Sequence, residues 1–116
     1  MAEQGKSSTG MQANLAGLLA YVLGLVTGLV FFLIEKENKF VKFHAMQSIA
    51  FSLVMFAAGL IMGLIPFVGQ VGTALLNLAG LVVWILCMVK AYQGEWFKLP
   101  VLGDIAEKQV GGIPAA

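Results

Sequence analysis

Two long stretches without any charged residue constrain the fold of this chain most strongly. No Asp, Glu, Lys or Arg occurs from Leu15 to Ile34 or from Ala45 to Val89, and 59% of the 116 residues are hydrophobic. An α-helix needs about 20 apolar residues to cross the hydrocarbon core of a bilayer. The first stretch is long enough for one crossing and the second for two. The sequence therefore predicts an all-α integral membrane protein with three transmembrane helices.

The second stretch contains a turn signal near its middle. The sequence GLIPFVGQVG, residues 63–72, has three glycines and a proline, which lacks an N–H and disfavours helix at the residue before it. Asn38 is a candidate N-cap for the helix that precedes this turn. We interpret residues 15–108 as a single membrane domain. Its predicted membrane helices span about residues 15–34, 39–65 and 71–89.

The two ends of the chain differ in character from the membrane domain. Residues 1–14 are polar and rich in Gly, Ser and Thr, so we expect a disordered N-terminal tail. Residues 109–116 are expected to form a flexible C-terminal tail. The segment GEWFKLPVLGDIAEK, residues 94–108, mixes apolar residues with five charged ones. This mixture excludes a fourth crossing and predicts a cytoplasmic segment that lies against the lipid headgroups.

The 94–108 segment also suggests a contact with the membrane helices. One hypothesis is that it folds back under the bundle and covers the end that carries His44. Asp104 or Glu107 would then be available to pair with Lys39 or Lys42.

The lysine distribution predicts the orientation in the membrane. Six lysines flank the second and third predicted helices on one side, and only Lys6 lies on the other, since the Pro66 turn has no charge. Short cytoplasmic loops carry the excess of lysine, so we expect an inner or plasma membrane protein with its N-terminus outside and its C-terminus cytoplasmic. The lysines expected to set this orientation and to reach the headgroups include Lys36, Lys39, Lys42 and Lys98.

Small residues recur at helical spacing and indicate close helix packing. Gly24 and Gly28 form a GxxxG pattern, and Gly59 and Gly63 form another. Such residues let helix backbones approach closely in lipid. They are consistent either with packing inside one chain or with a homo-oligomer or a membrane-protein partner. Asn77, an intramembrane amide, is expected to make an interhelical hydrogen bond, with a place on a transport path as the alternative.

His44, Gln47 and Ser48 form the candidate site. Their spacing of i, i+3 and i+4 places them on one face of the second predicted helix. One interpretation is a polar cluster at the cytoplasmic mouth of a bundle that binds a headgroup, an ion or a partner segment. The other is structural: the histidine bonds the neighbouring loop, and Gln47 and Ser48 bond between helices.

Several function classes find no support in the sequence. No set of nucleophile, base and acid and no phosphate-binding loop occurs, so we expect neither an enzyme nor a cofactor. The spacing of the acidic residues around His44 does not force a metal site. Cys87 is the only cysteine and there is no arginine, so neither an intrachain disulfide nor nucleic acid binding is expected.

Two longer segments carry a family resemblance. FLIEKENKFVKFHAMQSIAF, residues 32–51, together with YQGEWFKLPVLGDIAEK, residues 92–108, resembles a family of small prokaryotic membrane proteins classed as a domain of unknown function. That family is distantly similar to the channel component of the chloroplast inner-envelope protein-import translocon, which has four spans. The resemblance implies a multi-spanning helical protein and no defined activity. Its motif residues correspond here to Phe43, His44, Gln47, Ser48, Pro100, Gly103 and Asp104.

Together these features lead to two expectations about function. The first is a small structural, assembly or translocation-related membrane subunit without enzymatic activity, in contact with the lipid bilayer. The alternative is a homo-oligomeric channel or transporter for a small solute or ion. A third option is an enzyme that acts on lipid headgroups.

Overall fold

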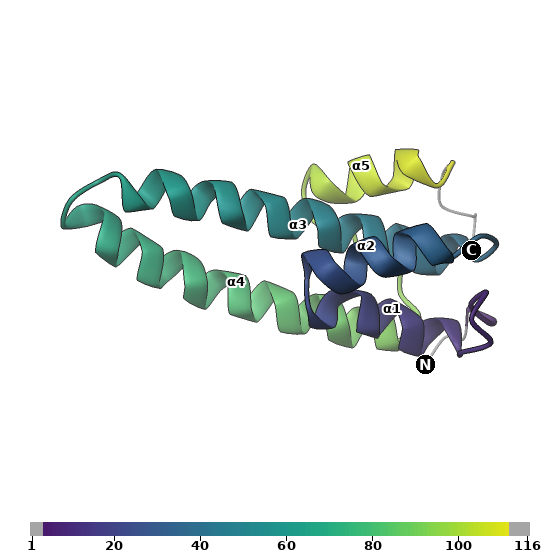
Figure 1. Ribbon diagram of the computed structural model, residues 1–116. Coiled ribbons are helices and arrows are strands. Elements are labelled where there is room, and N and C mark those ends of the chain that lie inside the picture. The colour runs from purple at the N-terminus through teal and green to yellow at the C-terminus, as the bar shows by residue number, and fades with distance from the viewer. Residues whose placement is uncertain (1–3, 112–116) are drawn as a thin grey trace.

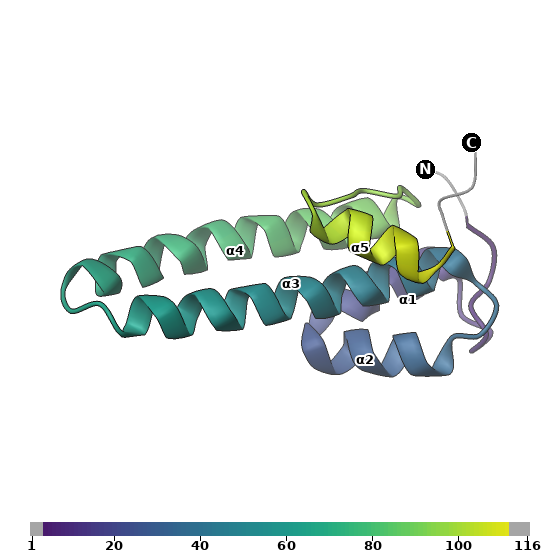
Figure 2. The ribbon, with the colours of Figure 1, turned by 90° about the horizontal axis from the view of Figure 1, so that it is seen from above.

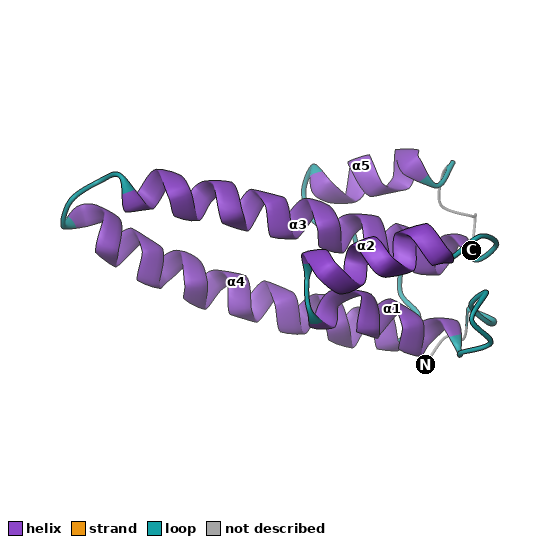
Figure 3. Cartoon of the chain, viewed as in Figure 1, coloured by secondary structure: helices purple, strands orange, loops and turns teal. Residues whose placement is uncertain are grey.

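The computed structural model describes residues 4–111, and this part of the chain contains five helices and no strand (Figure 3). The molecule is elongated, with principal extents of 48 × 25 × 24 Å. Residues 1–3 and 112–116, the outer parts of the two expected tails, lie outside the described residues. The helices are α1 (Ala13–Val22), α2 (Leu25–Ile34), α3 (Lys39–Gly63), α4 (Val68–Tyr92) and α5 (Leu102–Gln109).

The architecture combines two long helices with three short ones. The long helices α3 and α4 have 25 residues each and run antiparallel along the whole molecule (Figure 1). At a rise of about 1.5 Å per residue, each is about 37 Å long. By length and composition these two helices could cross a membrane. Helices α1 and α2 have ten residues each, about 15 Å, and lie along half of the long pair.

The predicted single helix over residues 15–34 is wrong. The chain turns back at Leu23 and Gly24, so that α1 and α2 form a helical hairpin (Figures 1 and 2). Gly24 has φ 59° and ψ −113°, a conformation open to glycine and costly for other residues. A Cβ at this position would also meet the Ser52 hydroxyl at 2.8 Å. The hairpin leaves two helices of spanning length where three were expected.

Side chains hold the α1–α2 turn by bonding its backbone. The Thr27 hydroxyl donates to the carbonyl of Ala20 at 3.0 Å and accepts from the N–H of Leu23 at 3.1 Å. The Ser48 hydroxyl donates to the Gly24 carbonyl at 3.0 Å. The Trp84 indole N–H donates to the carbonyl of Tyr21 at 2.5 Å. These bonds satisfy backbone N–H and C=O groups that would have bonded one another in an uninterrupted helix.

The termini of the long helices follow their sequence signals closely. The Asn38 side chain accepts from the N–H of Val41 at 3.2 Å, which confirms the predicted N-cap of α3. The second predicted helix ends two residues early, at Gly63, and the third begins three residues early, at Val68. The Pro66 turn between them is present as expected.

The N-terminal segment is packed rather than free. The Gln4 side chain donates to the carbonyl of Gly94 at 2.7 Å, and the Asn38 side chain donates to the carbonyls of Gln4 and Lys6 at 2.9 and 3.0 Å. Residues 4–14 therefore do not form the expected disordered tail. They lie at the same end of the molecule as the α2–α3 loop and the segment after α4. The expectation that the two termini occupy opposite sides conflicts with this arrangement.

We predict that positions 6 and 98 are accessible from the same side of the membrane. In a Cys87→Ala background, Lys6→Cys and Lys98→Cys should both react with a membrane-impermeant maleimide from one side only. Phe67→Cys, in the turn at the far end, should react only from the other side. Labelling of positions 6 and 98 from opposite sides would contradict the hairpin formed by α1 and α2.

Candidate functional site

The structure brings His44 and Gln47 together with Tyr21, a residue that the sequence did not single out. His44 Nδ1 lies 2.6 Å from the Tyr21 hydroxyl, and Gln47 Nε2 lies 2.9 Å from the same hydroxyl. All three side chains are completely buried. They join α1 to α3 in the half of the molecule that holds the N-terminal segment and α5.

The proton positions in this cluster follow from its partners. His44 Nε2 lies 2.9 Å from the carbonyl oxygen of Glu95. A carbonyl can only accept, so Nε2 carries the proton and Nδ1 accepts from the Tyr21 hydroxyl. The Tyr21 oxygen in turn accepts from Gln47. With an uncharged imidazole every donor of the cluster therefore meets an acceptor within the chain.

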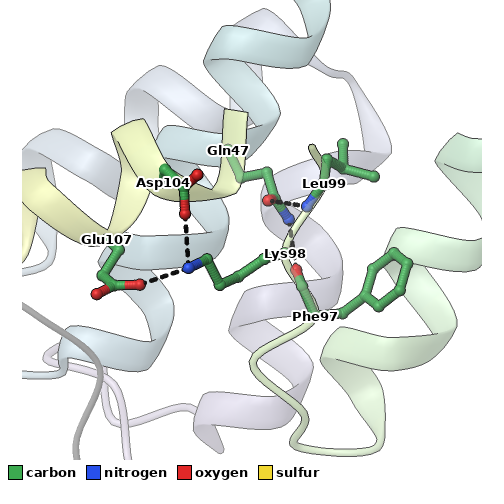
Figure 4. A network of polar contacts seen from close by, with 6 residues as sticks. All are labelled: Gln47, Phe97, Lys98, Leu99, Asp104 and Glu107. Carbon is green, nitrogen blue, oxygen red and sulfur yellow. Dashed lines mark hydrogen bonds and ion pairs between the residues drawn. The ribbon is translucent and has the colours of Figure 1, made fainter. Parts of the chain in front are cut away.

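Gln47 also fixes the chain that follows α4 (Figure 4). Its Nε2 donates to the carbonyl of Phe97 at 2.8 Å, and its Oε1 accepts from the N–H of Leu99 at 2.9 Å. These two bonds reproduce the pairing that a neighbouring strand would offer. His44 and Gln47 thus hold residues 95–99 against α3, and we call this segment the C-terminal strap.

The residues of the C-terminal motif shape the turn after the strap. The Leu102 N–H donates to the carbonyl of Pro100 at 2.7 Å, and the next helix, α5, begins there. A Cβ on Gly103 would come within 2.4 Å of Lys98 Cβ and 3.0 Å of Gln47 Oε1. Only glycine fits this position, because the strap and the Gln47 amide pass close to it.

Lys98 forms a two-armed ion pair with α5 (Figure 4). Its Nζ lies 2.7 Å from Asp104 and 2.7 Å from Glu107. The hydrogen bonds that Lys98 donates to the carboxylates of Asp104 and Glu107 raise the pKa of Lys98, and the bond from Lys98 lowers the pKa of Asp104. The hypothesis that Asp104 or Glu107 pairs with Lys39 or Lys42 is therefore wrong. The pairing is local and solvent-exposed, a kind that contributes little to stability.

The other lysines that were expected to reach the lipid headgroups lie where the α2–α3 loop leads into α3. Lys36 and Lys39 are exposed. Lys42 is half-buried, with its Nζ 4.6 Å from the centre of the Phe32 ring, a cation–π arrangement.

Ser48 and Asn77 lie away from the cluster. Ser48 is buried, but it bonds Gly24 at the α1–α2 turn and not His44 or Gln47. Asn77 is exposed on α4 and makes no hydrogen bond to any described residue. The structure therefore splits the predicted set into a His44–Gln47 cluster, a turn support at Ser48, and an isolated amide.

Glu35 is a second polar centre that sequence reasoning missed. This carboxylate is 0% exposed and holds the N-terminal segment to the α2–α3 loop. It accepts hydrogen bonds from the Ser7 and Ser8 hydroxyls and from the N–H groups of Ser8 and Asn38, the last at 3.0 Å. Burial raises the pKa of Glu35, but these bonds outweigh it and hold the pKa below its ordinary value.

The missed residues gave little signal in the sequence. In the sequence, Tyr21 and Trp84 are ordinary members of apolar stretches. The hydrogen bonds of their side chains depend on the unexpected α1–α2 hairpin. Glu35 was considered only among the acidic residues whose spacing does not force a metal site at His44. Among the described residues no group of three or more His, Cys, Asp or Glu side chains lies close enough to hold a metal ion.

We predict that Gln47→Leu releases the C-terminal strap. The change removes both bonds to the strap and leaves the partly buried Phe97 carbonyl and the buried Leu99 N–H without a partner, at a cost of about 3 kcal/mol. Hydrogen exchange in detergent should show lost protection at Leu99. Gln70→Leu is the control, because the Gln70 side chain is exposed and bonds no described residue. Equal protection of Leu99 in the two variants would refute this role.

We also predict an acid-sensitive docking of the N-terminal segment. Because the pKa of Glu35 is lowered in the folded state, its contribution is complete above its unfolded pKa, near the ordinary value of 4.5. It is lost as the pH falls through the folded value. Exchange at the Ser8 and Asn38 amides should therefore rise below about pH 4.5. Glu35→Gln should remove this pH dependence. A wild-type profile that stays flat down to pH 3 would contradict the assignment.

Comparisons with known proteins place the chain in a family. A model described as the magnetosome magnetite crystal formation protein family, MamF/MmsF, matches residues 6–106. The UPF0132 membrane protein MJ1443 of Methanocaldococcus jannaschii is 50% identical over 104 residues, which cover 90% of this chain and 94% of that protein. A UPF0132 membrane protein of Archaeoglobus fulgidus is 47% identical over 103 residues, covering 89% and 100% of the two chains.

These comparisons refine the resemblance drawn from the sequence. The relatives bear the name of membrane proteins and no activity, in agreement with a family of unknown function. Similarity to a chloroplast import channel is not shown by them. No solved structure matches the chain. Since the family model spans most of the sequence and the relatives are about half identical along their length, the chain belongs to the MamF/MmsF family of membrane proteins, together with the UPF0132 proteins.

Proposed function

We propose that this protein is a non-enzymatic structural or assembly subunit of a membrane complex, which works through surfaces that its helices offer to other membrane proteins. The proposal rests on one observation: the buried polar side chains of the candidate site already form hydrogen bonds within the chain. Tyr21, His44 and Gln47 are buried and bonded to one another and to the strap. Side chains engaged in this way stabilise the fold, and their hydrogen-bonding groups are already used within the chain.

The surface that remains available is apolar. Large hydrophobic side chains are exposed along both long helices, among them Phe56 and Leu60 on α3 and Leu78 and Val82 on α4. In a bilayer such side chains contact lipid or other helices. The two ends differ, since the end with the chain termini is polar and firmly cross-linked by hydrogen bonds. This division suits a subunit that is anchored by α3 and α4.

The orientation in the membrane is part of this proposal. All seven lysines of the chain lie at the end that carries α5 and the N-terminal segment, and the Pro66 turn carries no charge. By the preference of lysine for cytoplasmic loops, that end faces the cytoplasm in the inner or plasma membrane. Both described chain ends are then cytoplasmic. From the names of the relatives we carry over only the membrane setting, and from the family description, which names magnetite crystal formation, we carry over nothing.

A second candidate function rests on the α1–α2 hairpin. Its turn at Gly24 faces Ser48 and Ser52, which lie near the middle of α3. Non-helical backbone at mid-depth in a membrane is found where protein buries it or where it lines a water-filled cavity. A homo-oligomeric channel would provide such a cavity.

A crosslinking experiment in native membranes tests the subunit proposal. A photoreactive residue at Val82, which is 59% exposed, should yield a crosslinked complex with a defined second protein or copy. The same residue at Ala91, which is buried, should react only within the chain and serves as the control. Recovery of a lone 12.3 kDa chain, crosslinked to lipid alone from every exposed position, would overturn the proposal.

The purified protein in vesicles separates the two candidates. The subunit proposal expects no ion or solute flux above that of empty vesicles. Flux that Asn77→Leu abolishes would instead establish the channel.

A further inference from the structure

The two halves of the molecule contain different numbers of helices. Helices α3 and α4 run through both halves, whereas α1 and α2 lie beside them in one half only (Figure 1). Helix α5 lies in that same half, on the flank of α3 opposite to α2 (Figure 2). We call the half that holds α1, α2 and α5 the wide half, and the half that ends in the Pro66 turn the narrow half. Within residues 4–111, the narrow half consists of the long helices and their turn alone.

The α1–α2 hairpin reaches the middle of the long helices and stops there. The Gly24 carbonyl at its turn accepts from the Ser48 hydroxyl at 3.0 Å, and a Cβ on Gly24 would lie 2.8 Å from the Ser52 hydroxyl. These two serines flank Phe51, the central residue of α3. Each short helix is about 15 Å long, which is half of the roughly 30 Å hydrocarbon core of a bilayer. When α3 and α4 cross a bilayer, the hairpin therefore extends from one surface to the midplane.

The outward face of the hairpin is suited to acyl chains. No charged residue occurs from Leu15 to Ile34, and Val26, Leu29 and Leu33 are exposed on α2. Apolar surface of this kind is favoured in hydrocarbon over water. The turn of the hairpin does not oppose this placement, because side chains of α2 and α3 bond its backbone groups.

Helix α5 adds width at the membrane surface. Its Gly103 and Ala106 are buried against the rest of the chain, and its Asp104 and Glu107 pair with Lys98 in solvent-exposed ion pairs. Charged side chains are costly in hydrocarbon, so such a helix lies among the headgroups. A tilt of about 20°, which is ordinary for membrane helices, lowers one flank of a molecule 25 Å wide by about 9 Å relative to the other. This difference allows α2 to lie among acyl chains while α5 lies among headgroups.

Hydrogen bonds hold the hairpin against both long helices. The Trp84 indole donates to the Tyr21 carbonyl at 2.5 Å and links α4 to the end of α1. The Tyr21 hydroxyl bonds His44 and Gln47 of α3, and these three side chains are completely buried. Any movement of the hairpin away from the long helices would break these bonds. The wide half therefore keeps its width.

The additional helices displace lipid from one leaflet only. With a diameter of about 10 Å, a helix occupies about 80 Å² of membrane area. Helices α1 to α4 together displace about 320 Å² of one leaflet, and α3 and α4 alone displace about 160 Å² of the other. A flat bilayer has to crowd one leaflet to accommodate this difference. A curved bilayer accommodates it without crowding when the wide half lies in the convex leaflet, which is also why helices inserted into a single leaflet respond to curvature.

We propose that this protein is a wedge that concentrates in curved membrane, with its wide half in the convex leaflet. The inference rests on the proposed function, because it takes α3 and α4 as the membrane anchor, and it adds a lipid partner: a bilayer whose two leaflets differ in area. In the proposed orientation the convex leaflet is the cytoplasmic one. A complex that contains this subunit would then assemble where the membrane bulges toward the cytoplasm.

Sorting into membrane tubes tests the wedge on the full chain. In a Cys87→Ala background, Lys6→Cys marks the wide half and Phe67→Cys marks the turn of the narrow half. Giant vesicles of phosphatidylcholine with a minor fraction of phosphatidylglycerol receive the protein in both orientations. A membrane-impermeant fluorescent maleimide added outside then labels only the copies that present the marked end. In a tube pulled outward from such a vesicle, the outer leaflet is the convex one.

The two labels should sort in opposite directions. Copies labelled at position 6 carry the wide half in the outer leaflet, so their density should be about twofold higher in the tube than in the vesicle, equivalent to about 0.4 kcal/mol per copy. Copies labelled at position 67 have the reverse orientation and should be depleted about twofold in the tube. Each label is the control for the other, because the dye, the lipid and the helices are the same.

Trimmed side chains test whether the taper causes the sorting. Leu29→Ala combined with Leu33→Ala narrows the wide half and should bring both density ratios closer to one. Leu60→Ala combined with Leu75→Ala removes the same atoms from the narrow half and should move both ratios further from one. All four leucines are exposed, so neither pair disturbs the interior. Unaltered exchange protection at Leu99 will show that both variants fold normally.

The outcomes distinguish this inference from the proposed function. Equal ratios for the two labels, or enrichment of position 67 over position 6, would overturn the wedge, because a taper sorts the two orientations oppositely. Trimming that shifts the ratios equally in the two halves would overturn it as well. A native complex crosslinked through Val82 would persist in either case, and the subunit proposal would stand. Opposite sorting without any crosslinked protein partner would support the wedge and contradict the subunit proposal.

Discussion

A turn of the backbone beside the middle of the long helices is the constraint on which the rest of this structure depends. Helices α1 and α2 stop at Leu23 and Gly24, and their exposed carbonyl and N–H groups need partners. Thr27, Ser48 and Trp84 supply them from α2, α3 and α4. Because each supporting side chain comes from a different helix, the turn fixes the relative positions of four helices.

Tyr21 connects this turn to the hydrogen-bonded cluster formed with His44 and Gln47. Tyr21 is bonded through its carbonyl to Trp84 and through its hydroxyl to His44 and Gln47. One residue thus connects the turn to the cluster that holds the C-terminal strap. The strap carries Lys98, whose ion pairs reach α5. A continuous set of contacts therefore connects the turn to α5, through buried side chains as far as the strap and through exposed ion pairs from there. Glu35 holds the N-terminal segment separately.

The sequence predicted the parts of this fold that depend on local signals. The Asn38 cap, the Pro66 turn and the long helices follow from capping, proline chemistry and hydrophobic length. The break at Gly24 could not be predicted in this way, because the apolar stretch around it has the length of one membrane crossing. Its cause is a tertiary set of hydrogen bonds. His44 and Gln47 were recognised as unusual, but their burial depends on a strap more than 45 residues away in the chain.

The charge distribution has a consequence for how the chain enters a membrane. In the orientation proposed above, the segment that passes completely through the bilayer is the short connection Leu64–Phe67, which contains only apolar residues and a proline. No charged side chain has to leave water during this passage, so the large penalty for burying an ion does not arise. In the same proposal the α1–α2 hairpin enters and returns on the side where it began. Insertion of residues 4–111 from one side would then require no charged segment to cross the bilayer.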